Sequence, residues 1–169
     1  MMIEEAIKTA IEYETRIRDI YRDAAHQVSD PAGKKFFKML GDDEQFHIEY
    51  LKDRLSLWEK TGKLYAEKLD TRVPSMERIR RSTAKVKAHM SKEDLSSEKV
   101  MLGRALKAEV ETSDFYKKMV NELPEHGQKM FARFLEIEEH HIAAVQAELD
   151  YITHTGYWFD FKEFDMEEL

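Results

Sequence analysis

One pattern of acidic and histidine residues occurs twice in this chain of 169 residues. Glu14 precedes the string Glu44-Gln45-Phe46-His47, and Glu109 precedes the string Glu138-Glu139-His140-His141. Each copy is thus a single Glu, followed about thirty residues later by a Glu with a His three positions on. The second copy lies 94 or 95 positions after the first. A spacing of three puts the Glu and the His of each pair on the same face of a helix.

All six residues interrupt apolar seams of helical period. In four segments, apolar residues recur at steps of three and four, which is typical of the inward face of a helix in a bundle. The seams are Ile3, Ile7, Ala10, Glu14, Ile17, Tyr21 and Ala24; Phe37, Leu40, Glu44, His47, Leu51, Leu55 and Trp58; Leu102, Ala105, Glu109, Thr112, Tyr116, Met119 and Leu123; and Phe131, Phe134, Glu138, His141, Val145, Leu149 and Ile152. We therefore expect the acids and histidines of the repeated pattern to face the core.

Turn signals divide the chain into four long helices. Asp30 and Pro31 are typical of a helix start, Gly62 is typical of a helix end, and Pro124 closes the last short connection. Residues 63–95 then form a long crossover, within which we expect 75–90 to make a short helix across the bundle. The predicted fold class is all-α: a ferritin-like antiparallel four-helix bundle over residues 1–155, with its one long crossover between helices 2 and 3.

Four ionised carboxylates in one core require a compensating cation, because an unpaired buried carboxylate costs several kcal/mol. Two divalent ions would balance four Glu, and two neutral imidazoles would complete the ligand shell. Helical bundles that hold two iron or manganese ions use this set of residues, and zinc is a further candidate for such ligands. The alternative is a hydrogen-bonded polar network without metal. The predicted ligands are Glu14, Glu44, His47, Glu109, Glu138 and His141.

With these residues, the chain resembles the rubrerythrin-related branch of the ferritin-like diiron proteins over roughly residues 2–155. The resemblance also rests on a Tyr seven positions after each single Glu, at Tyr21 and Tyr116. It implies two iron ions per chain, with manganese or zinc as alternatives. Glu14 and Glu109 would then be terminal ligands. The resemblance also implies that Glu44 and Glu138, the Glu residues of the two Glu-x-x-His pairs, bridge the two ions. Each His would then bind one ion.

The chain differs from rubrerythrin itself in three respects. Rubrerythrins typically carry a rubredoxin domain whose iron is held by four Cys, whereas this chain contains no Cys. Thr112 stands where rubrerythrin has a further Glu on the third helix. The fourth helix also reads Glu136-x-x-Glu139-His140, so Glu139 and His140 are an alternative to Glu138 and His141 as ligands. The seam and the internal repeat favour the latter pair.

Tyr21 and Tyr116 lie two turns beyond the single Glu residues, on the same helix faces. A phenol can donate a hydrogen bond to a ligating carboxylate and fix its orientation, and we expect these two Tyr, together with Thr112, to surround the ligands in this way. The alternative is that both are core aromatics whose hydroxyls are satisfied elsewhere.

The resemblance implies a diiron redox protein that reduces hydrogen peroxide or dioxygen, as in protection against oxidative stress. Electrons would come from a separate donor such as a rubredoxin-type protein, and no catalytic residue is expected beyond the metal ligands. The alternatives are a ferroxidase or iron-handling protein, and a non-catalytic, metal-stabilised interaction module.

Composition and the chain ends set further expectations. The net charge of -7 argues against a nucleic-acid partner, and nowhere do eighteen apolar residues stand together, so we expect no membrane span. The amino terminus lacks the pattern of a secretory signal, which favours a cytoplasmic protein. The aromatic tail, residues 156–169, should fold onto the bundle or cover a neighbouring subunit; the second case would make a homo-oligomer, most simply a dimer.

Overall fold

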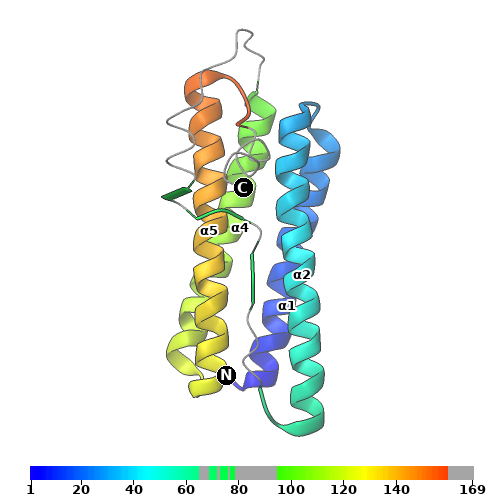
Figure 1. Cartoon of the computed structure of the whole chain (residues 1–169), viewed down its shortest axis with the longest axis vertical. Coiled ribbons are helices and arrows are strands. Elements are labelled where there is room, and N and C mark those ends of the chain that lie inside the picture. The colour runs from blue at the N-terminus through cyan, green and yellow to red at the C-terminus, as the bar shows by residue number, and fades with distance from the viewer. Residues whose placement is uncertain (65–68, 72, 76, 79–94, 160–169) are drawn as a thin grey trace.

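The computed structural model describes residues 1–64, 69–71, 73–75, 77–78 and 95–159. Four long helices make up its bundle (Figure 1): α1 (Ile3–Gln27), α2 (Pro31–Thr61), α4 (Ser96–Glu122) and α5 (Glu125–Thr155). The prediction of an all-α four-helix bundle is confirmed for the described part of the chain. Within that part, no helix is long and apolar enough to cross a membrane.

The helix ends follow from local chemistry. The Asp30 side chain accepts a hydrogen bond from the Ala32 N–H at 2.8 Å, and Pro31 is the first residue of α2. Gly62 and Gly156 end α2 and α5 with φ values of 66° and 77°, a left-handed conformation that favours glycine. The Gly62 N–H donates to the Trp58 carbonyl, and the Gly156 N–H to that of Ile152, each at 2.8 Å.

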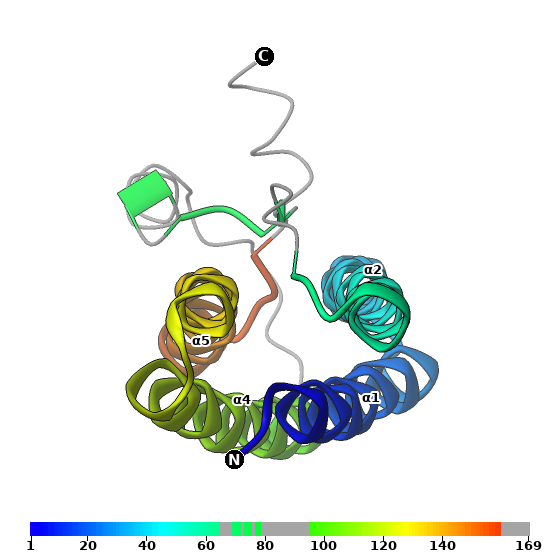
Figure 2. The same ribbon diagram turned by 90° about the horizontal axis from the view of Figure 1, so that it is seen from below.

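Seen along the bundle, the helices form an open arc in the order α2, α1, α4, α5 (Figure 2). Helix α1 packs against α2 and against α4, and α4 packs against α5. The colours in Figure 1 show that α1 and α5 run in one direction and α2 and α4 in the other. The connection from α2 to α4 must therefore return along the length of the bundle. Most of the short helix expected within 75–90 lies outside the described residues.

Two segments fill the side of the arc that lies between α2 and α5 (Figure 2). One is the strap, which we define as the described residues Leu69, Asp70, Thr71 and Val73. Leu69 and Val73 are buried, and Arg133 Nε of α5 donates to the Leu69 carbonyl at 2.8 Å. The strap thus closes the bundle where no long helix does.

The second segment is the chain end just after α5. Trp158 and Phe159 are buried, and the Trp158 ring packs against Phe36 and Phe37 of α2. A Cβ atom at Gly33 would lie 2.7 Å from the Trp158 ring, so only glycine fits there. The tail therefore folds onto its own bundle as far as residue 159. Residues 160–169 lie outside the described part, and the expected oligomer stays a prediction.

The seam residues form two apolar clusters, one toward each end of the bundle. Ile17, Leu40 and Leu102 belong to one cluster, and Ile7 and Leu51 to the other. Every seam residue is buried apart from Leu55, Trp58 and Leu149, which are half-buried. The polar seam residues lie between the two clusters, and the site is built from them.

Candidate metal centre

The six predicted ligands come together at mid-bundle from all four helices. Helix α1 contributes Glu14, α4 contributes Glu109, and α2 and α5 contribute one Glu-x-x-His pair each. All six side chains have an exposed fraction of 0%. Since neither the Glu nor the His of a pair reaches solvent, their charges can be balanced only by one another, by protons or by a bound cation.

One group of ligand atoms surrounds His141. Its Nδ1 atom lies 2.7 Å from Glu44 Oε1, 3.3 Å from Glu109 Oε1 and 4.0 Å from Glu138 Oε1. Each of these four residues offers a ligand atom within 4.8 Å of the others. Three carboxylates and one imidazole nitrogen are hard and intermediate donors of the kind that iron and manganese accept.

A second group consists of Glu14, Glu44 and His47, which also offer one ligand atom each within 4.8 Å of one another. His47 Nδ1 lies 3.8 Å from Glu44 Oε2. Glu44 belongs to both groups and turns one oxygen toward each histidine. Its carboxylate can therefore bridge two ions. Glu138 belongs only to the His141 group, so its bridging role stays a prediction.

Each predicted ligand carries at least one buried atom without a hydrogen bond. Eight such atoms gather in the site: Glu14 Oε2, both Glu44 oxygens, His47 Nδ1, Glu109 Oε2, both Glu138 oxygens and His141 Nδ1. Of these, Glu44 Oε1 and His141 Nδ1 lie 2.7 Å apart as an ion pair when the imidazole is protonated. A buried polar atom without a partner costs about 1–3 kcal/mol, and native structures contain few of them. The unpaired atoms are the ones that would coordinate, so the residues fit a pair of metal ions.

The two buried phenols connect the halves of the site. Tyr21 of α1 donates a hydrogen bond to Glu109 Oε1 of α4, and Tyr116 of α4 donates one to Glu14 Oε1 of α1. The expected contact between phenol and carboxylate is present, but each phenol reaches the acid of the other helix. Thr112 is buried, and its hydroxyl donates to the Ala108 carbonyl of its own helix at 2.8 Å.

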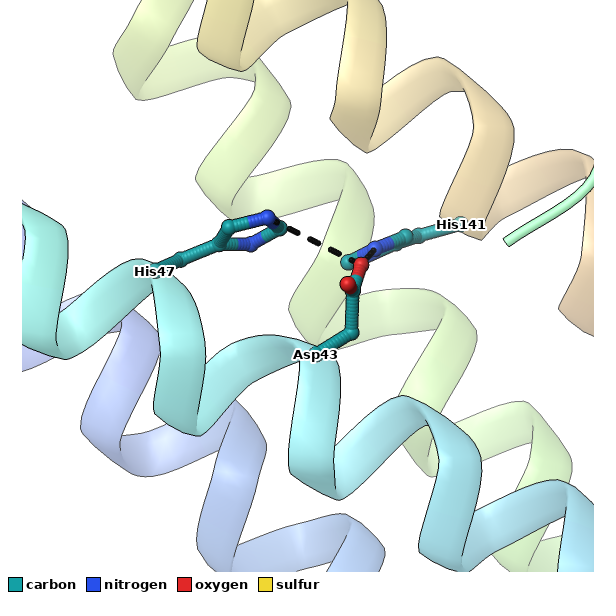
Figure 3. Close-up of side chains that lie close together, drawn as sticks. All are labelled: Asp43, His47 and His141. Carbon is teal, nitrogen blue, oxygen red and sulfur yellow. Dashed lines mark hydrogen bonds and ion pairs between the residues drawn. The ribbon is translucent and has the colours of Figure 1, made fainter. Parts of the chain in front are cut away.

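Asp43 belongs to the site although its role was not predicted. Its Oδ2 atom accepts a hydrogen bond from His141 Nε2 at 2.7 Å and lies 3.7 Å from His47 Nε2 (Figure 3). The carboxylate is thus placed between the outer edges of both imidazoles. Asp43, His47 and His141 also offer one ligand atom each within 4.8 Å of one another, and they form a third, outer group. When a metal ion replaces the Nδ1 proton of His141, the remaining proton on Nε2 is held by Asp43, which leaves the Nδ1 lone pair directed at the inner acids. Asp43 stands one position before the seam and one turn before His47, so its spacing indicates a place near His47 but not its contact with His141.

The strap completes the outer side of the site. Thr71 Oγ1 donates to Asp43 Oδ2 at 2.7 Å, and the Asp70 carbonyl lies 3.3 Å from His47 Nε2. Both histidines therefore have an oxygen acceptor on the side away from the carboxylates. This arrangement favours the same tautomer at His47 and at His141.

The pKa shifts show how strongly the site demands positive charge. Burial and the neighbouring Glu44 raise the pKa of the Glu14 carboxyl well above its usual value. Burial and Glu109 do the same to the pKa of Glu138. Burial would lower the pKa of His141, but the carboxylates of Glu44 and Glu109 outweigh it and raise that pKa well above the usual value. Without metal, protons take the place of the missing cations.

The pKa values of two neighbouring acids, Asp43 and Glu109, are lowered. Burial would raise the pKa of Asp43, but the hydrogen bond and charge of His141 lower it overall. Burial also opposes ionisation of Glu109, and the charge of His141 again wins, so the pKa of Glu109 is lowered. The His141 imidazolium of the metal-free site therefore pairs with these two carboxylates.

The alternative ligand pair on α5 points away from the site. Glu139 is exposed and His140 is half-buried, whereas Glu138 and His141 are both buried among the other ligands. Glu136, which begins the alternative string, is also exposed. The helix phase read from the apolar seam therefore agrees with the inward face of α5.

Comparisons of the chain with protein-family models, with curated proteins and with solved structures gave no match.

Proposed function

We propose that the protein is a two-metal redox protein, related to rubrerythrin, that reduces hydrogen peroxide with electrons from a separate donor. One observation carries the proposal: six fully buried side chains from four helices form two ligand groups that share Glu44. A polar network evolved for stability alone would pair its atoms, whereas Glu14 Oε2, Glu109 Oε2 and Glu138 Oε2 here have no hydrogen bond.

The helix directions support a ferritin-like topology. Helices α2 and α4 run in parallel, although they are consecutive long helices, so a long crossover must join them (Figure 1). In ferritin-like diiron proteins, single Glu residues and Glu-x-x-His pairs project into such a bundle from its four helices. The single Glu residues of this chain come from α1 and α4, and the pairs from α2 and α5. The rubrerythrin relationship itself rests on this pattern.

A pair of Fe(II) ions would supply two electrons, which with two protons reduce one hydrogen peroxide molecule to two water molecules. The chain's own residues prepare the site for this chemistry. The phenols of Tyr21 and Tyr116 each donate a hydrogen bond to one oxygen of Glu109 and Glu14, which fixes these carboxylates and leaves their second oxygens without a hydrogen bond. The apolar clusters above and below exclude water, and this strengthens the attraction between carboxylates and cations.

Repeated turnover needs an electron donor outside these 169 residues. They contain no Cys, and so no rubredoxin-type iron site can be formed among them. We infer that a separate electron-transfer protein reduces the site after each turnover.

A ferroxidase is the second candidate, and Thr112 is the observation that favours it. The Thr112 hydroxyl is bonded to the Ala108 carbonyl, so at this position α4 contributes no further carboxylate beyond Glu109. A site with fewer anionic ligands binds its ions less tightly, which suits a protein that oxidises Fe(II) and passes it on. In that case iron is the substrate.

The test is an anaerobic titration. Metal-free protein is loaded with Fe(II), desalted and assayed for iron per chain by mass spectrometry, and the visible spectrum is followed as hydrogen peroxide is added. Two irons per chain and one peroxide consumed per pair support the proposal. Continued uptake of Fe(II) in air, beyond two ions per chain, would favour the ferroxidase. A folded bundle that binds little iron would contradict both and favour a metal-independent interaction module.

A further inference from the structure

A chain of aromatic rings leads from the site to the surface of α1. Tyr116, whose hydroxyl is bonded to Glu14, contacts Phe115 with ring centroids 5.6 Å apart. Phe115 in turn stacks on Tyr13 at 5.0 Å, with 25° between the ring planes. Tyr13 is half-buried, whereas Tyr116 is fully buried. The outer ring therefore meets solvent and the inner phenol meets a predicted ligand.

Tyrosine is among the side chains most easily oxidised by one electron, so a phenol bonded to a redox site is a source of electrons. Peroxide needs two electrons, and a site that has been only half reduced supplies one of them. We propose that Tyr13 supplies the second electron, across Phe115 and through Tyr116, when the external donor is exhausted. This inference rests on the proposed peroxide reduction.

The transfer balances in electrons and protons. Tyr116 gives one electron to the site and its phenolic proton to Glu14, to which it already donates a hydrogen bond. The Tyr116 phenoxyl then takes an electron from Tyr13 and regains its proton from Glu14, while the Tyr13 proton passes to solvent. In sum, one peroxide, one electron from the site, one from Tyr13 and two protons give two waters. The radical ends at a half-buried residue, where a small reductant such as ascorbate can return the electron and proton.

Among the residues that the structure describes, two other aromatic routes lead from the site to a Tyr or Trp. Tyr50 is reached from Tyr116 across Phe134, with centroid distances of 5.3 and 5.9 Å and a 57° tilt at the outer contact. Its outer contact is longer than that of Tyr13 and is not stacked. Arginine side chains lie 5.1 Å from the Tyr13 ring and 5.0 Å from the Tyr50 ring, so nearby charge does not distinguish them.

The third route runs from Tyr21 to Phe37 at 6.3 Å and on to Trp158 at 5.4 Å. It ends at a side chain that is only 4% exposed. A radical there would stay inside the protein. The route to Tyr13 combines the shortest outer ring contact with access to solvent. We therefore assign Tyr13 as the residue at which the radical reaches the surface.

The experiment uses full-length protein loaded with two Fe ions per chain, oxidised, and then reduced by one electron equivalent. One equivalent of hydrogen peroxide is added without a donor. Electron paramagnetic resonance of rapidly frozen samples detects tyrosyl radical, and peptide mass spectrometry locates oxidised Tyr. The expected result is a radical and modification at Tyr13, both suppressed by ascorbate. Phe115→Leu, which breaks the ring contact, and Tyr116→Phe should each remove most of the modification at Tyr13.

Tyr157→Phe is the matched control. Tyr157 is half-buried like Tyr13, but it follows the end of α5, about 20 Å along the helix axis from His141. This variant should keep full modification at Tyr13. Peroxide consumption with Tyr13 unmodified, or with oxidation at Tyr50 instead, would overturn the inference and leave the proposed function intact. Modification of Tyr13 that persists in both Phe115→Leu and Tyr116→Phe would also overturn it. Absence of both consumption and modification would overturn the two together.

Discussion

The two halves of the bundle, α1 with α2 and α4 with α5, use the same inner residues but differ on the outer side of the site. Each half provides a single Glu, a Tyr and a Glu-x-x-His pair in equivalent places, and each Tyr bonds the single Glu of the opposite half. The position before the pair is Asp43 in α2 and Ile137 in α5. Asp43 contacts both histidines, whereas Ile137 belongs to the apolar core.

The inner ligands are therefore duplicated between the two halves, whereas the residues that support them on the outer side are shared. One carboxylate orients His141 directly and lies near His47, and the strap holds that carboxylate through Thr71. A change at Asp43 should therefore affect both halves, whereas a change at a terminal ligand should affect mainly one.

The largest effect is expected at Glu44, because it alone belongs to both ligand groups. Glu44→Gln removes the shared carboxylate and should abolish binding of both ions, whereas Glu138→Gln should leave one ion bound. Iron per chain after anaerobic loading and desalting measures this. Glu49→Gln, an exposed change on the same helix, is the control and should load fully. Equal losses in Glu44→Gln and Glu138→Gln would show that the halves are more symmetric than the structure indicates.

Asp43→Asn should weaken metal binding by about 10- to 100-fold, the range observed when an outer partner of a metal-ligating histidine is changed. The amide can turn its N–H₂ group toward His141 and disturb the tautomer that presents Nδ1. Competition with a chelator of known affinity measures both binding steps. The neighbouring exposed Asp42→Asn is the matched control. A loss confined to one of the two ions would contradict the shared role of Asp43.

The effect of pH should differ between metal-free and loaded protein. In the metal-free fold the pKa values of Glu14 and Glu138 are raised above 4.5 and that of His141 above 6.5, so the folded chain binds more protons than the unfolded chain. The three groups contribute fully to the free energy of unfolding when the pH is below their ordinary pKa values. This contribution is lost as the pH rises through their raised pKa values in the folded chain. Glu109 and Asp43 have lowered pKa values, so their contribution is full above the ordinary values and is lost only in acid.

Thermal unfolding from about pH 5 to about pH 9 should therefore show the metal-free protein losing stability with rising pH. The loaded protein should gain stability over the same range, because metal binding releases protons and tightens as pH rises. Parallel curves for the two forms would mean that the carboxylates do not exchange protons for metal.

The smallest effect is expected at the crossed phenols. Tyr21→Phe and Tyr116→Phe each leave one buried carboxylate oxygen without its donor, which should lower the free energy of unfolding of the metal-free protein by about 1–3 kcal/mol. The two losses should be similar, because the contacts are equivalent. Chemical denaturation with circular dichroism measures them. Clearly unequal losses would mean that the crossed contacts do not support the two halves equally.

The parts of the molecule that local patterns specify could be predicted from the sequence. The four seams, the caps at Asp30 and Gly62 and the inward phase of His141 all depend on residues within a few turns of one another. Glu139, the alternative to Glu138 as a ligand, lies outside the seam and is exposed in the structure.

What could not be predicted depends on how the helices meet. Asp43 reaches His141 only because α2 and α5 face each other across the open side of the arc, and no periodicity within α2 encodes that. Tyr21 lies two turns from Glu14 on one helix, yet it bonds Glu109 on another. The strap has no repeating pattern at all, and its contacts with Asp43 and His47 follow from the path of the crossover.

A crystal structure of the manganese-loaded protein with anomalous scattering data tests most directly whether the site holds two ions. Two anomalous peaks per chain are predicted, one on each side of the Glu44 carboxylate, with His47 and His141 each bound to one ion through Nδ1. A folded bundle with no peak, with a single peak, or with a peak only at the outer set of Asp43, His47 and His141 would contradict the account.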